Sequence, residues 1–417
     1  ACERIVRNEA LSEDKKMLDF CQDIFQLAAE SKYPEYDPKY HDNFDSPHWS
    51  SDPRIEAAEG IMILVRNIKY ASRRNLDLIL KLSQDPVPSV RYQIIRRSHY
   101  LFKTAKSDMW KLIEKFSREE KTNGNLAATA VVLESLAGIE TDRVLDLFEV
   151  IESRQHIQDR KKAGTHNDPI VSTVTELYLV RNNQRAKERL GVYLQDAVKF
   201  YEEITDAAIT SINYLIIKDD SKVKAKEDEI KGRTRELILS ILQSACIGLK
   251  KLANAEKGDD TQKIMREVYH AIEIIGRWVY FNSDEEKKQL TSDDLKKYYF
   301  EVKPILEKVI QVGQEITFLS PSTVHYLVQF CNRALQCDPQ GVIKIAHDLC
   351  MLPSGYPSDS FALGEVKKLI ETSVVDHKEA LRNQETMKYM MQIINSFVKA
   401  GWNEAIELSL KLDEVWR

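Results

Sequence analysis

Three short apolar stretches of the chain begin at Ile55, Val90 and Leu126, about 35 residues apart. Each stretch has the length and residue spacing of an apolar helix, and a polar segment rich in Asp and Pro precedes each of the first two. A helix pair that recurs at this period cannot bury its apolar face alone, so successive copies stack on one another. The pattern therefore predicts an all-α fold with an α-solenoid over residues 53–152.

Outside this block the apolar patterns are longer and less regular. An amphipathic stripe predicts a first helix over residues 12–31, with Ser12 as its cap. Residues 184–217 and 221–255 predict two long helices that pack as an antiparallel hairpin. Further helices are expected at 259–281, 292–312, 321–336 and 339–351, followed by a break at 353–357 that contains two prolines and a glycine.

Two polar segments divide the chain into predicted parts. Residues 32–52 contain several aromatic residues and three prolines, and loops of this length are usually functional or disordered. Residues 153–168 are polar and basic, as in a linker. The predicted parts are an N-terminal helix with the aromatic loop (1–52), the helical repeats (53–152), the basic linker (153–168), a long-helix hairpin and stack (169–352) and a C-terminal helical cap (353–417).

The second repeat carries a recognisable motif. Asp85, Val90 and Arg91 form an Asp-x-x-x-x-Val-Arg pattern that resembles the HEAT repeat of the armadillo-like superfamily. The resemblance implies that the Asp lies in the turn between paired helices and that the Arg opens the second helix. The repeats around Ile55 and Leu126 lack the Arg, so the motif is specific in one repeat only. A HEAT-like solenoid, followed by a less regular long-helix portion, is the expected fold.

Two other stretches, residues 46–58 and 397–417, resemble the carboxy-terminal helical region of very large bacterial proteins. Some of those proteins look like members of the STAND class of nucleotide-dependent sensors in antiviral defence. The resemblance implies a recognition or scaffold region of a bacterial multi-domain sensor. The chain begins at Ala1 without Met, so we expect a piece of a longer polypeptide with an upstream domain.

Composition narrows the fold and the cellular location. With 14 Gly and 12 Pro in 417 residues, tight hairpins are few and extensive β structure is disfavoured. The 60 basic and 65 acidic residues nearly balance, which gives no overall attraction to nucleic acid or to acidic membranes. Six dispersed cysteines favour the cytoplasm over a disulfide framework. No stretch is long and apolar enough to predict a membrane span.

Candidate chemistry is sparse. His41, Asp42, Asp45 and His48 bring four potential metal ligands into eight residues, but such Asp-rich loops are more often solvated turns. No P-loop, H-E-x-x-H or G-x-S-x-G motif is present. We therefore expect no metal, no cofactor and no catalytic residues. A Cys nucleophile paired with a distant His stays open, because such pairs meet only in space.

The leading hypothesis is a non-enzymatic protein-interaction scaffold. The first alternative is a nucleic-acid-binding solenoid, an architecture that resembles the alkylpurine DNA glycosylases, with arginine pairs and the basic linker along one wall. The last alternative is an unrecognised hydrolase. The candidate partner contacts are Tyr33, Tyr36, Trp49, Arg73, Arg74, Arg96, Arg97, Arg154, Arg160, Lys161 and Lys162.

Overall fold

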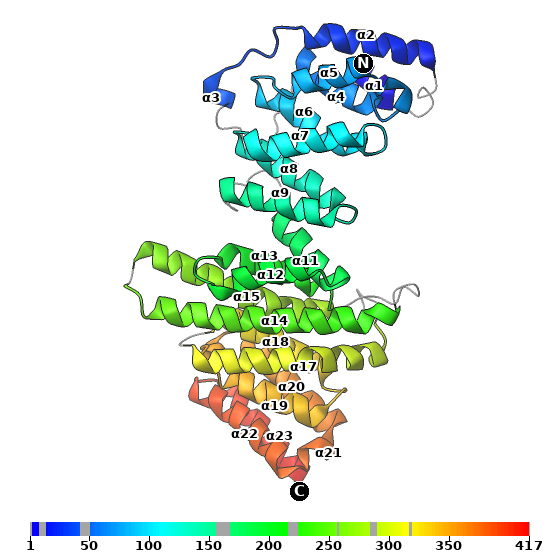
Figure 1. The fold of residues 1–417 in the computed structure, drawn as a ribbon. Helices are drawn as coiled ribbons and strands as arrows, with labels where there is room; N and C mark the ends of the chain where they lie inside the picture. Colours follow the sequence, from blue (N-terminus) through cyan, green and yellow to red (C-terminus); the bar gives the residue numbers. More distant parts are fainter. Residues whose placement is uncertain are drawn as a thin grey trace. The chain divides into compact units, whose positions relative to one another are not determined.

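The computed structural model describes residues 2–7, 14–41, 51–155, 167–215, 224–256, 258–283, 290–316 and 319–416. Every regular element among these residues is a helix, so the chain is all-α, as predicted. It forms two compact units, Ala1–Leu177 and Tyr178–Arg417, called unit 1 and unit 2 below (Figure 1). Within the same residues, none of the helices is both long and apolar enough to cross a lipid bilayer.

Unit 1 consists of N-terminal helices followed by a stack of helical hairpins. The N-terminal helices are α1 (Cys2–Arg7), α2 (Lys15–Ala29) and α3 (Pro38–His41). The hairpins are α4 (Pro53–Leu64) with α5 (Arg73–Leu82), α6 (Pro88–Arg97) with α7 (Lys106–Glu119), and α8 (Asn123–Leu136) with α9 (Thr141–Arg154). They begin at residues 53, 88 and 123, which confirms a repeat of 35 residues. The short 3-10 helices η2 (Ile68–Tyr70) and η3 (Ser98–Phe102) lie inside the first two hairpins, and α11 (Pro169–Arg181) contains the boundary between the units.

The hairpins of unit 1 stack through their first helices. α2, α4, α6 and α8 form a row in which each helix packs against the next, while α5, α7 and α9 flank that row. α4 and α8 are apolar on nearly all sides and are therefore central, because a helix without a polar face must be covered all round. α5 and α7 have a single apolar stripe and bury only that side. The apolar pattern thus decides which helix of each pair is buried.

Unit 2 is a stack of unequal helices that alternate along the chain between two rows. In one row α13 (Tyr201–Ile212), α15 (Asp259–Asn282), α18 (Pro321–Ala334), α20 (Ala362–Asp376) and α23 (Glu404–Trp416) pack in succession. The other row contains α12 (Gln184–Gln195), α14 (Lys224–Ala253), α17 (Ser292–Glu315), α19 (Pro339–Cys350) and α22 (Gln384–Lys399). The short elements η4 (Tyr356–Ser358) and α21 (Lys378–Leu381) complete the unit. Helix lengths between 12 and 30 residues make this stack less regular than unit 1.

The prediction of one long helix over residues 184–217 is wrong. This segment forms α12 and α13, which are separated by a turn at residues 196–200. The side chain of Asp196 accepts a hydrogen bond from the backbone N–H of Val198 at 3.1 Å, and a local bond of this kind competes with the helical one. Ala197 also packs closely on α14, where a Cβ on Gly248 would lie 2.7 Å from the Cβ of Ala197. Tertiary packing of the turn therefore overrides the continuous helical pattern.

The other predicted helices are present with small shifts of their ends. The first long helix, α2, begins after Asp14, whose side chain caps it, and Ser12 lies outside the described residues. The predicted break at 353–357 is confirmed, since Gly355 adopts a left-handed conformation with φ 69° just before η4. Trp402, in the turn between α22 and α23, donates a hydrogen bond to the carbonyl of Pro357 at 2.7 Å. The C-terminal helices are thereby tied to the break.

Candidate functional site

The turn between α5 and α6 is built around the carboxylate of Asp85. Its Oδ1 accepts a hydrogen bond at 2.9 Å from the backbone N–H of Val87, which precedes α6. Arg54, in the first turn of α4, binds the same carboxylate through two nitrogens, at 2.7 and 3.1 Å. Both side chains are largely buried. A planar guanidinium that meets a carboxylate in this paired way fixes one repeat against the next.

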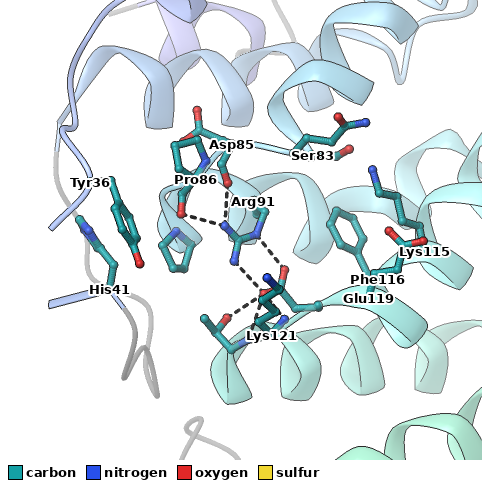
Figure 2. Close-up of a pocket in the computed structure, with 14 residues that line it drawn as sticks. Tyr36, His41, Ser83, Asp85, Pro86, Arg91, Lys115, Phe116, Glu119 and Lys121 are labelled. Carbon is teal, nitrogen blue, oxygen red and sulfur yellow. Dashed lines mark hydrogen bonds and ion pairs between the residues drawn. The ribbon is translucent and has the colours of Figure 1, made fainter. Parts of the chain in front are cut away.

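The next turn repeats the arrangement about 35 residues later. Glu120 accepts hydrogen bonds from the backbone N–H groups of Lys121 and Thr122, and Arg91 binds it through two nitrogens at 2.9 and 2.7 Å. Arg91 also donates to the carbonyls of Asp85 and Pro86, at 2.6 and 3.0 Å (Figure 2). Asp85 thus lies in a turn between helices and Arg91 in the first turn of the helix that follows. The HEAT-like resemblance implies a turn within a helix pair, whereas this turn joins the hairpin α4–α5 to the hairpin α6–α7. Arg91 joins two successive turns of the stack.

The electrostatics of Glu120 follow from this setting. Burial by itself raises the pKa of this carboxyl group. The hydrogen bonds and the positive charge of Arg91, together with the backbone N–H groups, act in the opposite direction, and the pKa is lowered overall. Glu120 is therefore a structural anion, held ionised by a permanent cation.

Residues 31–41, called the aromatic segment below, lie beside these turns. Tyr36 stacks on His41 with ring centroids 5.5 Å apart and an interplanar angle of 21°. Nδ1 of His41 accepts a hydrogen bond from the backbone N–H of Asp37 at 2.8 Å, which orients the ring. Arg54 donates to the carbonyls of Ser31 and Pro34 at 2.9 and 2.8 Å. The same arginine that holds Asp85 therefore anchors the chain that carries Tyr36.

Between the aromatic segment and the repeat turns lies a groove of about 740 Å³, called the edge groove below. Tyr36 and His41 form one side, and Lys115 and Glu119 lie across the Arg91 cluster from them (Figure 2). The complete lining is Tyr36, His41, Ser83, Gln84, Asp85, Pro86, Pro88, Arg91, Lys115, Phe116, Glu119, Glu120, Lys121 and Thr122. The groove combines aromatic and proline faces with charged side chains, a composition suited to binding.

The structure places the predicted aromatic contacts unevenly. Tyr36 is 44% exposed and lines the edge groove, whereas Tyr33 is exposed beside it without lining it. Trp49 lies outside the described residues, as do Arg160, Lys161 and Lys162 of the basic linker. Among the predicted contacts that the structure describes, Tyr36 alone lines this groove.

Most of the predicted arginine contacts already have partners within the protein. Arg73 pairs with Asp77 at 2.8 Å and Arg74 with Gln26, both on the surface. Arg96 lies over the ring of Tyr92 at 5.5 Å.

Arg97 is buried, whereas Arg154 is exposed but uses its guanidinium group within the protein. Arg97 is only 4% exposed, because it pairs with the buried Glu59 and with Gln93 at 2.6 Å. Arg154 ends α9 and donates to the carbonyls of Ser117, at 2.6 Å, and Glu120. The expectation of an exposed Arg97 is corrected by this burial, and Arg154 links the last repeat to the one before it.

Metal and nucleophile chemistry find little support among the described residues. Of the four potential ligands in the aromatic loop, only His41 is described, and the described part of the chain contains no cluster of metal-binding side chains. Burial raises the pKa of the Cys21 thiol to about 11 and that of Cys350 to about 12, and it also raises the pKa values of Cys246 and Cys331. These four thiols are protonated at neutral pH and are poor nucleophiles.

Comparison with known proteins does not assign the chain to a family. No protein-family model matches the chain, and no curated protein matches it. One solved structure that it resembles is described as a circular tandem repeat protein with novel repeat topology and enhanced subunit contact surfaces. The two chains are 11% identical with a TM-score of 0.35, and the match covers 99% of this chain and 93% of the other.

Proposed function

We propose that this chain is a protein-interaction scaffold and that the edge groove of unit 1 binds an extended segment of a partner protein. One observation carries the proposal: Tyr36 is held in place by the Arg54 anchor and is still 44% exposed at the groove. An exposed aromatic side chain on a fixed backbone lowers the entropy lost on binding, so such residues often dominate the affinity of an interface.

The lining indicates the chemistry of the bound segment. Pro86 and Pro88 line the groove together with Tyr36, so an aromatic or proline residue of the partner fits against their faces. The side chains of Lys115 and Lys121 form no ion pair within the described part of the chain. A carboxylate of the partner would supply one. The proposed ligand is therefore an acidic peptide segment that contains an aromatic residue or a proline.

The nucleic-acid alternative is weaker in unit 1, for a specific reason. It requires a row of available cations, whereas Arg97 is buried and Arg154 is bound to backbone carbonyls. Arg73 is paired with Asp77. The basic linker, which the alternative also uses, lies mainly outside the described residues.

The cellular location of the chain and the larger protein to which it belongs are also part of the proposal. We infer a cytoplasmic scaffold or sensor region, joined to an upstream domain in a bacterial multi-domain protein with a role in antiviral defence. The resemblance of residues 46–58 and 397–417 to such proteins supports this, and no family match adds to it. A purified longer polypeptide that contains this chain would show whether its activity depends on the edge groove.

The proposal is tested by selecting peptides from a displayed random library on the whole chain. Selected peptides should contain acidic residues next to an aromatic residue or a proline. Their affinity should fall by roughly tenfold or more in Tyr36→Ala and in Lys121→Glu, because each change removes a contact or reverses a charge in the groove.

Matched controls are available in the same segments. Tyr40 is 72% exposed on α3 and does not line the groove, and Lys111 is exposed on α7. Tyr40→Ala and Lys111→Glu should leave peptide affinity unchanged. If no peptide is enriched, or if all four variants bind equally well, the edge groove is not a peptide site. Salt-dependent binding of duplex DNA without any peptide binding would favour the alternative.

A further inference from the structure

A second pocket of unit 1, of about 760 Å³, lies at the opposite ends of the central helices from the edge groove. The edge groove uses the beginnings of α6 and α8, whereas this pocket uses the last residues of α4 and α8 together with η3. Its basic lining residues are Arg7, Arg66, His99 and Lys103. Within the described part of the chain, no Asp or Glu lines it. We call it the basic pocket.

Arg66 and Lys103 give this pocket its available positive charge. Neither side chain forms an ion pair among the described residues, and both are exposed. The guanidinium of Arg66 lies over the ring of Tyr100, 4.9 Å from the ring centroid, which positions it at the pocket wall. Arg7 also lines the pocket and is paired with the buried Glu59.

These cations are not required to cap the helix that they follow. The last turn of α4 is closed by backbone bonds, in which the N–H groups of Val65, Arg66 and Asn67 bind the carbonyls of Ile61, Ile63 and Leu64. The Arg66 side chain is therefore left for another role. A single cation near the C-terminus of a helix is explained by its favourable interaction with the helix dipole. Here a second cation, Lys103, reaches the same pocket from the turn after η3, and the dipole of α4 does not explain it.

The pKa of His99 reflects its burial and the positive charges around the pocket. Its ring lies edge-on to Tyr100 with centroids 4.6 Å apart, and the ring is half-buried. Burial, together with the charges of Arg66 and Arg97, lowers the pKa of His99. A bound anion would oppose that field.

The remaining lining is apolar. Ile63, Leu64, Leu136 and Ile139 form a wall beside the cations. A volume of about 760 Å³ falls within the range of small-molecule sites, roughly 300–1,000 Å³, which typically combine apolar walls with a few polar groups.

We propose that the basic pocket binds a small organic phosphate. Arg66, Lys103 and His99 contact the phosphate group, and the organic part lies against the apolar wall. Lysine and arginine side chains are the usual protein partners of phosphate oxygens. This site is separate from the edge groove, so its test is independent of the proposed peptide binding.

Isothermal titration of the whole chain with three probes tests the proposal. Phenyl phosphate should bind more tightly than inorganic phosphate, and phenol should not bind measurably. The double variant Arg66→Ala/Lys103→Ala should bind phenyl phosphate weaker by roughly tenfold or more, because charge-assisted hydrogen bonds are lost. The control Lys69→Ala/Lys111→Ala removes the same total charge from exposed positions outside the pocket and should bind as the wild type does.

A measurement on the unmodified chain guards against a variant that fails to fold. The pKa of His99, followed by NMR and assigned with His99→Gln, should rise when phenyl phosphate is added. Absence of binding by both phosphate probes overturns the proposal, as does equal weakening in the two double variants. An unchanged pKa of His99 in the presence of saturating phenyl phosphate would also place the ligand elsewhere.

Discussion

Glu120 shows how a single buried carboxylate organises the repeat turns. It is 5% exposed and gathers Arg91, the backbone N–H groups of Lys121 and Thr122, and the Thr122 hydroxyl around one side chain. Removal of one partner from such a cluster leaves the other groups buried without hydrogen bonds. The cluster therefore has to be complete, and the edge groove depends on it because Arg91 and Glu120 are part of its wall.

We predict that Glu120→Gln lowers the free energy of unfolding of unit 1 at pH 7 by about 3 kcal/mol. The lowered pKa of Glu120 means that its contribution is present above the unfolded value near 4.5 and is lost as the pH falls through the folded value. The difference between wild type and variant should therefore shrink in acid. Urea unfolding at pH 7 and below pH 4 measures it.

The neighbouring Glu119 provides the control for that experiment. Its side chain is exposed on the same turn, so Glu119→Gln should change the stability by less than about 0.5 kcal/mol at either pH. A Glu120→Gln variant that is as stable as Glu119→Gln would show that the Arg91 pair contributes nothing net to folding.

At the residue scale, the sequence predicts the role of Arg91 but not the equivalent role of Arg54. Asp85 and Arg91 match a known motif, and the structure places them in a turn and at the start of the next helix, although this turn joins two hairpins. Arg54 performs the corresponding task for the preceding repeat, yet it follows Pro53 directly, whereas Arg91 comes three residues after Pro88. Because the spacing between the proline and the arginine differs, the motif does not identify Arg54. A search for any Arg in the first helical turn after each turn carboxylate would have found it.

At the scale of the elements, Gly60 of α4 marks a close contact between two helices. A Cβ at this position would lie 2.2 Å from ring atoms of Phe25 in α2, whose side chain is itself fully buried. α2 therefore approaches α4 as closely as a helix without a side chain at residue 60 allows. This contact seats the N-terminal helix, and with it the start of the aromatic segment, on the solenoid.

We predict that Gly60→Ala destabilises unit 1 by about 1–3 kcal/mol, although alanine is the better helix former, because the Phe25 ring must move. Gly232 lies within α14, and nothing lies within 4 Å of a Cβ there. Gly232→Ala should stabilise unit 2 by about 0.5–1 kcal/mol. Thermal unfolding of both variants checks the opposite signs. Stabilisation by both changes would mean that α2 does not pack on α4 as described.

Element boundaries were predictable where local chemistry decides them. Prolines begin α4, α6, α18 and α19, as the sequence indicates. The break between α12 and α13 was missed because residues 196–200 contain neither Pro nor Gly. It depends on Asp196 and on the contact of Ala197 with Gly248, which is distant in sequence. The edge groove could not be predicted for the same reason, since it joins residue 36 to residue 121.

At the scale of the whole molecule, the division into two units matters most for stability. In each unit the helices pack mainly on their neighbours in the stack, so each helix is stabilised mainly by the helices next to it. Trp110 in α7 reports on unit 1, and Trp278 in α15 reports on unit 2. The chain has five tryptophans, so the units can be followed separately by fluorescence in variants in which Trp110 or Trp278 is the sole tryptophan that remains.

We predict that the chain unfolds in urea in more than one transition. Leu133 in α8 and Leu306 in α17 are both fully buried, and truncation of either to Ala should destabilise its own unit by about 2–5 kcal/mol. Leu133→Ala should shift only the transition reported by Trp110, and Leu306→Ala only that reported by Trp278. One coincident transition, shifted equally by both substitutions, would show that the two stacks fold as a single cooperative body. Independent transitions would mean that peptide binding at the edge groove and phosphate binding at the basic pocket stabilise the first unit alone, because a ligand stabilises only the folded region that it contacts.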